Sequence, residues 1–275
     1  MTLQWIRKHA LLTFFILAYA FSWMVEIPLV FSAQGVATAR VPFALHYLAG
    51  YGPLISALIV TRITGGSDGL RELWERMIHW RVKPGWWLVA VSPLGIYLLA
   101  SMALWLIQGQ KLDLAAMGEV DYLPPLGLVA IPLWILTFGI GEETGWRGFA
   151  LPRLQKGRSA LSATFLLWLS WALWHSPMFF YAYDPIIIPG MLIGLLAGSI
   201  IFTWLYNSIG GSVLITAIWH GLFNYTTACT SCKIGLIPAF ISTLVMLWAV
   251  VVVIRFQPAD LVHKRKQTTL CRRDA

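Results

Sequence analysis

Two adjacent carboxylates in an apolar stretch are the first residues with clear chemical potential. Glu142 and Glu143 lie in the run GIGEETGWRGF, and Arg147 follows Glu143 by four residues. Residues four apart share a helix face, so Glu143 and Arg147 are predicted to form an ion pair. Glu142 projects ~100° away from Glu143 and has no partner within its own helix. A carboxylate without a fixed counter-ion suits a general base, whereas a salt-bridged helix-packing contact is the alternative interpretation.

Two histidines in later apolar stretches complete the candidate set. His175 follows Trp171 by four residues, and Pro177 just after it is expected to kink the helix and open its backbone beside the histidine. His220 precedes Asn224 by the same spacing, so both side chains share one face and could hold an oxyanion. The alternative for each is a packing or interhelical hydrogen bond. No Ser or Cys has an evident partner base, so attack by activated water is favoured over an acyl-enzyme.

A metal site is a second use for the same side chains. Glu142, His175 and His220 would suit a catalytic zinc ion with three protein ligands and an open position. The zinc-protease motif HExxH is absent from the sequence, and the preferred site requires no cofactor. Glu26 and His46 are further ionisable residues in apolar stretches. Each lies near a predicted outer boundary, where an interfacial side chain can reach water, and we assign them no role.

These residues belong to a chain that is too apolar for a soluble globule. Of its 275 residues, 58% are hydrophobic and 12% are charged, and the charged share is about half of the roughly 25% found in soluble proteins. Disorder requires low hydrophobicity and high charge, so the same numbers exclude it. The composition predicts an all-α polytopic membrane protein.

About eight transmembrane helices are predicted, because eight apolar stretches meet or approach the roughly 20 residues that cross a bilayer. Between the second and third stretches, Leu70, Leu73 and Trp74 recur at helical spacing opposite Arg71 and Glu72, which predicts a short cytoplasmic interfacial helix. The eight predicted spans cover residues 9–31, 43–63, 86–107, 125–148, 160–181, 186–206, 212–229 and 235–256.

The distribution of basic residues predicts the topology. Residues 1–256 are expected to form a single transmembrane domain, and residues 257–275 a basic cytoplasmic tail. Cytoplasmic loops retain Lys and Arg, and with both termini inside, the 20 basic residues are all cytoplasmic except Arg40, Lys111 and Lys233. We therefore expect a multi-pass protein of the cell (plasma or inner) membrane. The net charge of +8 then reflects topology and contact with anionic lipid headgroups, and no nucleic-acid partner is expected.

Glycines and cysteines mark two further features. Gly190, Gly194 and Gly198 form a small-residue ridge that is predicted to let a neighbouring helix pack closely. Cys229 and Cys232 form a C-x-x-C at the predicted outer end of the seventh span, where an oxidising compartment could link them. A thioredoxin-type redox site also needs a βαβ context, so two small residues at a helix end are the alternative. Close packing is also expected around the two carboxylates, at Gly139, Gly141, Gly145 and Gly148.

The motifs E-E-x-x-x-R, aromatic-x-x-x-H and H-x-x-x-N, in this order, resemble those of the CPBP family. These are the CAAX-prenyl protease and bacteriocin-processing intramembrane proteases, also called Abi proteins. The resemblance covers the core from Glu142 to Asn224. One departure is Trp171, because the second motif commonly begins with Phe. The resemblance implies an eight-helix endopeptidase whose active site opens toward the cytoplasm from within the membrane.

The resemblance also implies roles for the motif residues. Glu142 corresponds to the catalytic glutamate, and His175 to its partner in activating water. His220 and Asn224 correspond to the pair proposed to hold the oxyanion. The family is usually classed among metalloproteases, and glutamate-activated water without metal is also proposed, so zinc stays possible. The rest of the first motif is expected to support the site structurally, namely Glu143 and Arg147.

Hydrolysis of a membrane-associated peptide or protein is therefore the preferred hypothesis, since none of the chemical residues is missing. The family names imply a prenylated carboxyl terminus or a bacteriocin leader, and the sequence does not choose between them. A non-catalytic membrane scaffold or regulator of the same fold is the alternative, because fold does not fix activity. A transporter could relay protons through buried Glu and His, but no matched pair of interrupted half-helices is evident.

Overall fold

The computed structural model is helical and contains no strand in the part of the chain that it describes, residues 2–36, 40–109, 119–124, 126–229, 232 and 236–262. Six helical segments are long and apolar enough to cross a membrane by length and composition. The prediction of an all-α, multi-pass membrane protein is confirmed at this level. The basic tail from residue 263 onward lies outside the described residues, as do Lys111 and Lys233.

Each of the eight predicted spans falls on a helical segment, but two of these segments are short. The helices α8 (Ala160–Trp174) and α10 (Val213–Ala228) have 15 and 16 residues, below the roughly 20 that cross a bilayer of ordinary thickness. The six long segments are Ala10–Ala33, Phe43–Met77, Pro84–Ile107, Gly127–Leu154, Pro185–Ser208 and Ile237–Arg255. Their main helices are α2 (Ala10–Ala33), α4 (Gly52–Met77), α5 (Pro84–Gln108), α6 (Ala130–Trp134), α9 (Ile188–Ser208) and α11 (Ile237–Arg255).

The prediction of a kinked but continuous helix through Pro177 is wrong. The helix α8 ends at Trp174, and the 3₁₀-helix η5 (Ser176–Phe180) begins two residues later with Pro177 in its first turn. Proline lacks an N–H and has a fixed φ, so it fits the first turn of a new element better than a helix interior. His175 therefore lies at the C-terminal end of α8 and not within a continuous helix.

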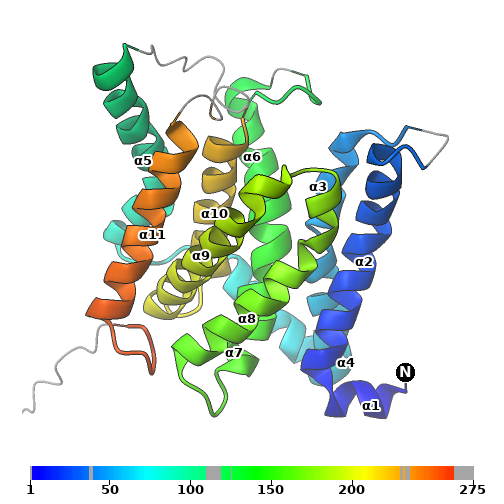
Figure 1. Cartoon of the computed structure of the whole chain (residues 1–275). Helices are drawn as coiled ribbons and strands as arrows, with labels where there is room; N and C mark the ends of the chain where they lie inside the picture. The colour runs from blue at the N-terminus through cyan, green and yellow to red at the C-terminus, as the bar shows by residue number, and fades with distance from the viewer. Residues whose placement is uncertain are drawn as a thin grey trace, which may run out of the picture.

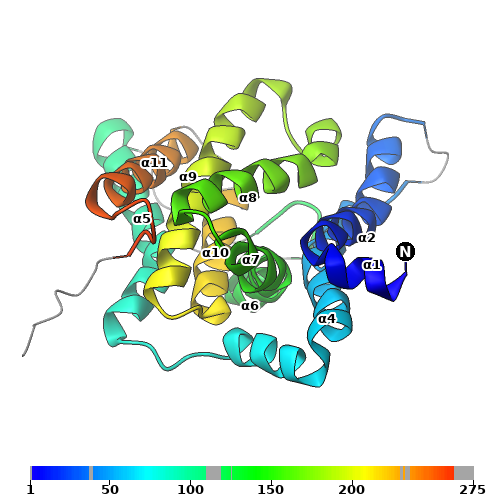
Figure 2. The same cartoon turned by 90° about the horizontal axis from the view of Figure 1, so that it is seen from below.

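The predicted interfacial helix is the second part of α4. The backbone changes direction at Gly66, whose φ of 64° lies in the left-handed region that glycine enters without steric cost. Beyond this break the helix runs across the lower end of the molecule (Figure 2). Leu73 on this segment is buried, whereas Trp74 is 57% exposed. One apolar side chain thus packs inward, and another is presented outward beside the charged residues of the segment.

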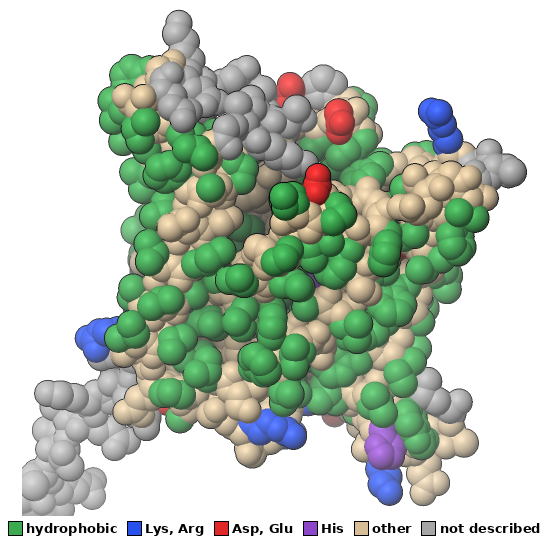
Figure 3. Space-filling view, in the orientation of Figure 1, with side chains coloured by type: hydrophobic (Ala, Val, Ile, Leu, Met, Phe, Trp, Pro, Cys, Tyr) green, Lys and Arg blue, Asp and Glu red, His purple; other side chains and the backbone are tan. Residues whose placement is uncertain are grey.

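Charged and apolar side chains are segregated along the bundle. The helix α1 (Leu3–Lys8), the short α7 (Leu151–Leu154) and the C-terminal end of α11 lie at the same end of the molecule (Figure 1). Basic residues occupy the last turns of all three. Hydrophobic side chains dominate the middle of the face in Figure 3, and charged side chains gather toward its upper and lower ends. This is the distribution that a bilayer requires of its proteins.

Helices approach closely around the carboxylate motif, as the glycines predict. A Cβ added at Gly141 would lie 2.6 Å from the carbonyl oxygen of Gly50, and one added at Gly145 would lie 2.5 Å from the Cβ of Pro53. Both distances are shorter than the non-bonded contacts that real Cβ atoms make. The segment that carries the carboxylates is therefore packed against the start of α4 at a distance that only glycine permits.

The second glycine prediction is wrong. An added Cβ at Gly190 or Gly194 would meet no described atom within 4 Å, and one at Gly198 would meet only Phe202 of the same helix. Ile193 on the same stretch of α9 is 56% exposed. No described helix therefore approaches Gly190 or Gly194 closely, and Gly198, although buried, would contact only its own helix.

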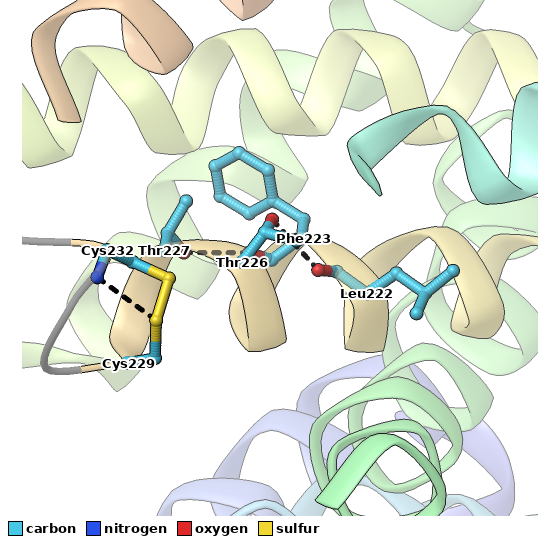
Figure 4. The surroundings of a disulfide bond; sticks show 6 residues. All are labelled: Leu222, Phe223, Thr226, Thr227, Cys229 and Cys232. Carbon is cyan, nitrogen blue, oxygen red and sulfur yellow. Dashed lines mark hydrogen bonds between the residues drawn. A yellow bond between two sulfur atoms is a disulfide. The ribbon is translucent and has the colours of Figure 1, made fainter. Parts of the chain in front are cut away.

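Cys229 and Cys232 form a disulfide just beyond the end of α10 (Figure 4). Both cysteines are buried, and the backbone N–H of Cys232 donates to Cys229 Sγ at 3.1 Å. The hydroxyl groups of Thr226 and Thr227 donate to the carbonyl of Phe223 at 3.0 and 2.8 Å. The disulfide thus links the residues that directly follow α10, the helix that carries His220. The described part of the chain has no strands, so the βαβ context of a thioredoxin-type site is not found there.

Candidate active site

The carboxylate motif lies in a long stretch of π-helix. After α6, the backbone continues as the π-helices η3 (Ile135–Glu142) and η4 (Thr144–Ala150), which are separated only by Glu143. A π-helix bonds each N–H to the carbonyl five residues earlier, and such turns are rare except at functional sites. The wider turn displaces side chains from the positions that α-helical spacing predicts, while the surrounding packing holds it in place.

One buried carboxylate joins the first and third motifs. Arg147 Nη1 donates to Glu143 Oε1 at 2.8 Å, which confirms the predicted ion pair. His220 Nδ1 lies 2.8 Å from the same oxygen. Glu143 and Arg147 have no exposed surface, and His220 is 4% exposed. A carboxylate only accepts hydrogen bonds, so His220 Nδ1 is the donor and its Nε2 is left for other contacts.

Residues of α9 complete the surroundings of Arg147. Arg147 Nη2 donates to Ser199 Oγ at 3.3 Å. Its guanidinium carbon lies 4.4 Å from the ring centre of Phe202 and 4.8 Å from that of Trp171. Stacking between aromatic rings suits the planar guanidinium and keeps water away from it. Sequence analysis missed Ser199 and Phe202, because a single hydroxyl and a single ring in an apolar helix carry no distinguishing signal.

Trp171 connects the first and second motifs. Its indole Nε1 donates to Glu142 Oε2 at 2.8 Å, and its backbone carbonyl lies 2.7 Å from His175 Nδ1. All three residues are buried, with exposed fractions of 3% for Trp171, 2% for Glu142 and 7% for His175. A carbonyl only accepts hydrogen bonds, so His175 Nδ1 carries a proton and the Nε2 of the neutral ring is an acceptor.

Both candidate histidines pack against the same indole. The ring centres of His175 and His220 lie 5.2 and 5.6 Å from that of Trp171. Asn224 lies one turn beyond His220 on α10, is half-buried, and forms no side-chain hydrogen bond within the described part of the chain. The structure thus brings together five of the six residues singled out from the sequence, namely Glu142, Glu143, Arg147, His175 and His220, and leaves Asn224 at the edge of the cluster.

The segment that carries this cluster is similar to known proteins. Residues 124–226 match the family model described as type II CAAX prenyl endopeptidase Rce1-like, and this range contains Glu142, His175, His220 and Asn224. The match covers the central region of this chain, which is called the matched region below. CAAX prenyl protease 2 of Methanococcus maripaludis is a curated relative, 34% identical over 115 residues. The alignment covers 38% of this chain and 40% of the length of that relative.

The ligand atoms of Glu142, His175 and His220 bear on the possible zinc site. No group of three His, Cys, Asp or Glu side chains is arranged to hold a metal ion in the part of the chain that the structure describes. Each member of the possible zinc set already uses one ligand atom. Glu142 Oε2 accepts from Trp171, and each histidine Nδ1 is bonded, His175 to a carbonyl and His220 to a carboxylate. These contacts leave Glu142 Oε1 and the Nε2 of each histidine as ligand atoms, and a histidine that binds zinc usually donates its other N–H in this way.

Glu26 and His46 are buried beside the matched region, contrary to the expectation that they reach water. Glu26 has no exposed surface, and His46 is 7% exposed. The Tyr181 hydroxyl donates to Glu26 Oε1 at 3.4 Å and lies 2.7 Å from His46 Nδ1. Because Tyr181 follows η5, these contacts tie the segment after His175 to α2 and to α3 (His46–Ala49).

Proposed function

We propose that this protein is an intramembrane endopeptidase that hydrolyses a peptide bond of a membrane-associated protein or peptide. The observation that carries the proposal is the contact of Glu142 and His175 with a single residue, Trp171, inside a bundle of apolar helices. An ionisable pair buried at such cost in an apolar protein favours a chemical role. The similarity of the matched region to the Rce1-like family model and to CAAX prenyl protease 2 supports the reaction class.

In the proposed reaction, Glu142 is the general base. It accepts one proton of a water molecule, and His175 Nε2 orients that water by accepting a hydrogen bond from its other proton. The water oxygen forms a bond to the scissile carbonyl carbon, and the carbonyl electron pair moves onto its oxygen. Glu142 then gives its proton to the leaving nitrogen as the C–N bond breaks. The products are a carboxylic acid and an amine, and Glu142 returns to its starting charge.

The oxyanion is proposed to be held by His220 and Asn224. In this role both ring nitrogens of His220 are donors, Nδ1 to the Glu143 carboxylate and Nε2 to the oxyanion. Asn224 lies one helical turn away and has an amide NH₂ with no other partner among the described residues. Arg147 neutralises Glu143 and fixes its position, so that Glu143 holds the imidazole without acting on the substrate.

We further propose eight membrane spans with both termini in the cytoplasm, in which α8 and α10 are the two short spans. The shared position of α1 and the end of α11, both with basic last turns, supports this topology. In a Cys271→Ser background, a membrane-impermeant maleimide should label Val36→Cys on intact cells and Thr2→Cys only after permeabilisation. Labelling of both on intact cells would contradict the topology.

The relative's name, CAAX prenyl protease 2, leads us to propose a peptide ending in a prenylated cysteine as the first substrate class, and a bacteriocin leader as the second. Purified protein in liposomes should cleave a farnesylated CaaX peptide, detected by mass spectrometry, and His175→Ala should not. His79→Ala, outside the cluster, is the matched control. Absence of cleavage by the wild type would refute the proposed activity, and equal cleavage by wild type and His175→Ala would remove His175 from the reaction. Rescue of a deletion phenotype by an inactive variant would favour a scaffold.

A further inference from the structure

The indole of Trp171 makes the only hydrogen bond to Glu142 that the described residues provide. It binds Oε2 and leaves Oε1 as the oxygen that can meet a water molecule. A carboxylate held at one oxygen has a fixed orientation, because rotation about its terminal bond would break the contact. The direction of this N–H therefore decides where the proposed general base points.

The indole itself is held on several sides. The guanidinium of Arg147 lies 4.8 Å from the ring centre, and the rings of Phe202 and His220 lie at 6.1 and 5.6 Å. Trp171 is also 3% exposed, so its ring has little room to rotate. Its backbone carbonyl meanwhile accepts from His175 Nδ1 and fixes that imidazole. One residue thus sets the orientation of both groups proposed to act on the water.

We propose that Trp171 is a positioning residue, whose indole N–H aligns Glu142 with His175 so that both act on one water molecule. This inference rests on the proposed function. The family motif commonly has Phe at this place, and Phe supplies the ring and the backbone carbonyl but no N–H. This chain therefore adds a hydrogen bond to the base that a phenylalanine could not make.

The substitution Trp171→Phe tests the proposal, because it keeps an aromatic ring and the carbonyl and removes the N–H. We expect kcat to fall about 10- to 100-fold with KM little changed, the effect of losing a hydrogen bond to a charged group that orients a reacting atom. Trp204→Phe is the matched control, since Trp204 is also buried and its Nε1 has no partner among the described residues. Equal kcat values for the two variants would overturn the proposal.

A spectroscopic measurement tests the contact independently of activity. In protein labelled with ¹⁵N-tryptophan, the indole signal of Trp171 is identified by its loss in Trp171→Phe. The signal should shift in Glu142→Gln and stay in place in Glu75→Gln, whose carboxylate is exposed and distant. An unmoved signal in Glu142→Gln would overturn the inference even if the protein is a protease. Conversely, absence of cleavage by the wild-type protein would refute the proposed function, while the shift still reports the hydrogen bond.

Discussion

Replacing Arg147 by methionine should lower the free energy of unfolding by about 3–5 kcal/mol, the cost of breaking a buried ion pair by removing one partner. Arg147 and Glu143 both have no exposed surface and meet at 2.8 Å. In Arg147→Met, Glu143 keeps only His220 as a partner, and its Oε2 already lacks a hydrogen bond in the described part of the chain. Methionine retains much of the volume, so the loss comes mainly from the stranded charge.

The double variant Glu143→Gln/Arg147→Met should recover most of this loss, because removing both charges of a buried pair is often close to neutral. The exposed pair Arg71 and Glu75, at 3.8 Å with 73% and 67% of each side chain exposed, is the control. Arg71→Met should cost at most about 1 kcal/mol. Reversible unfolding by SDS in lipid–detergent micelles, followed by circular dichroism, measures all three variants. If Arg147→Met and Arg71→Met cost the same, the buried pair is not what the structure describes.

Three further predictions concern the site and its packing. Asn224→Ala should lower kcat on the order of 10²–10³-fold with the protein folded, and an undiminished rate would remove Asn224 from the oxyanion site. Gly145→Ala should destabilise the protein by about 1–3 kcal/mol, because the added Cβ would lie 2.5 Å from the Cβ of Pro53. Gly194→Ala, whose added Cβ meets no described atom within 4 Å, should not destabilise it. Equal melting temperatures of the two variants would contradict this prediction. Prolonged dialysis against EDTA and 1,10-phenanthroline should leave cleavage unchanged, and loss restored by Zn²⁺ would show that a metal takes part.

The sequence predicts those parts of the site that depend on local spacing. The pair Glu143 and Arg147 follows from a four-residue separation, and the observed hydrogen bond confirms it. Close packing at Gly141 and Gly145 follows from the size of glycine. The six helical segments of spanning length follow from the length of the apolar stretches. In each case the determining interaction lies within one helix or depends on residue size alone.

Features that depend on which helix faces which could not be predicted in this way. The contact of His220 with Glu143 joins residues 77 apart in sequence, and that of Trp171 with Glu142 joins residues 29 apart. No rule of sequence spacing predicts that either pair of residues is in contact. The expected close packing at Gly190 and Gly194 of α9 is wrong for the same reason, because a small-residue pattern does not show whether a partner helix lies beside it.

Local backbone form was the other source of error. The turns around Glu142 are π-helical, with hydrogen bonds five residues apart, and apolar periodicity does not reveal them. Pro177 allows either a kink or a helix end, and the structure has the helix end. The consequence is functional, since it puts His175 at the end of α8, where its ring bonds the carbonyl of Trp171.

The most direct test of the central claim is the single-turnover cleavage rate of Glu142→Gln, with enzyme in excess over a farnesylated CaaX peptide in liposomes. The substitution keeps the size of the side chain and an oxygen that can accept from Trp171, and removes only the ability to take a proton from water. We predict a loss of at least about 10²-fold relative to wild type and no loss for Glu75→Gln. Cleavage by Glu142→Gln at the wild-type rate would contradict the assignment of Glu142 as the general base.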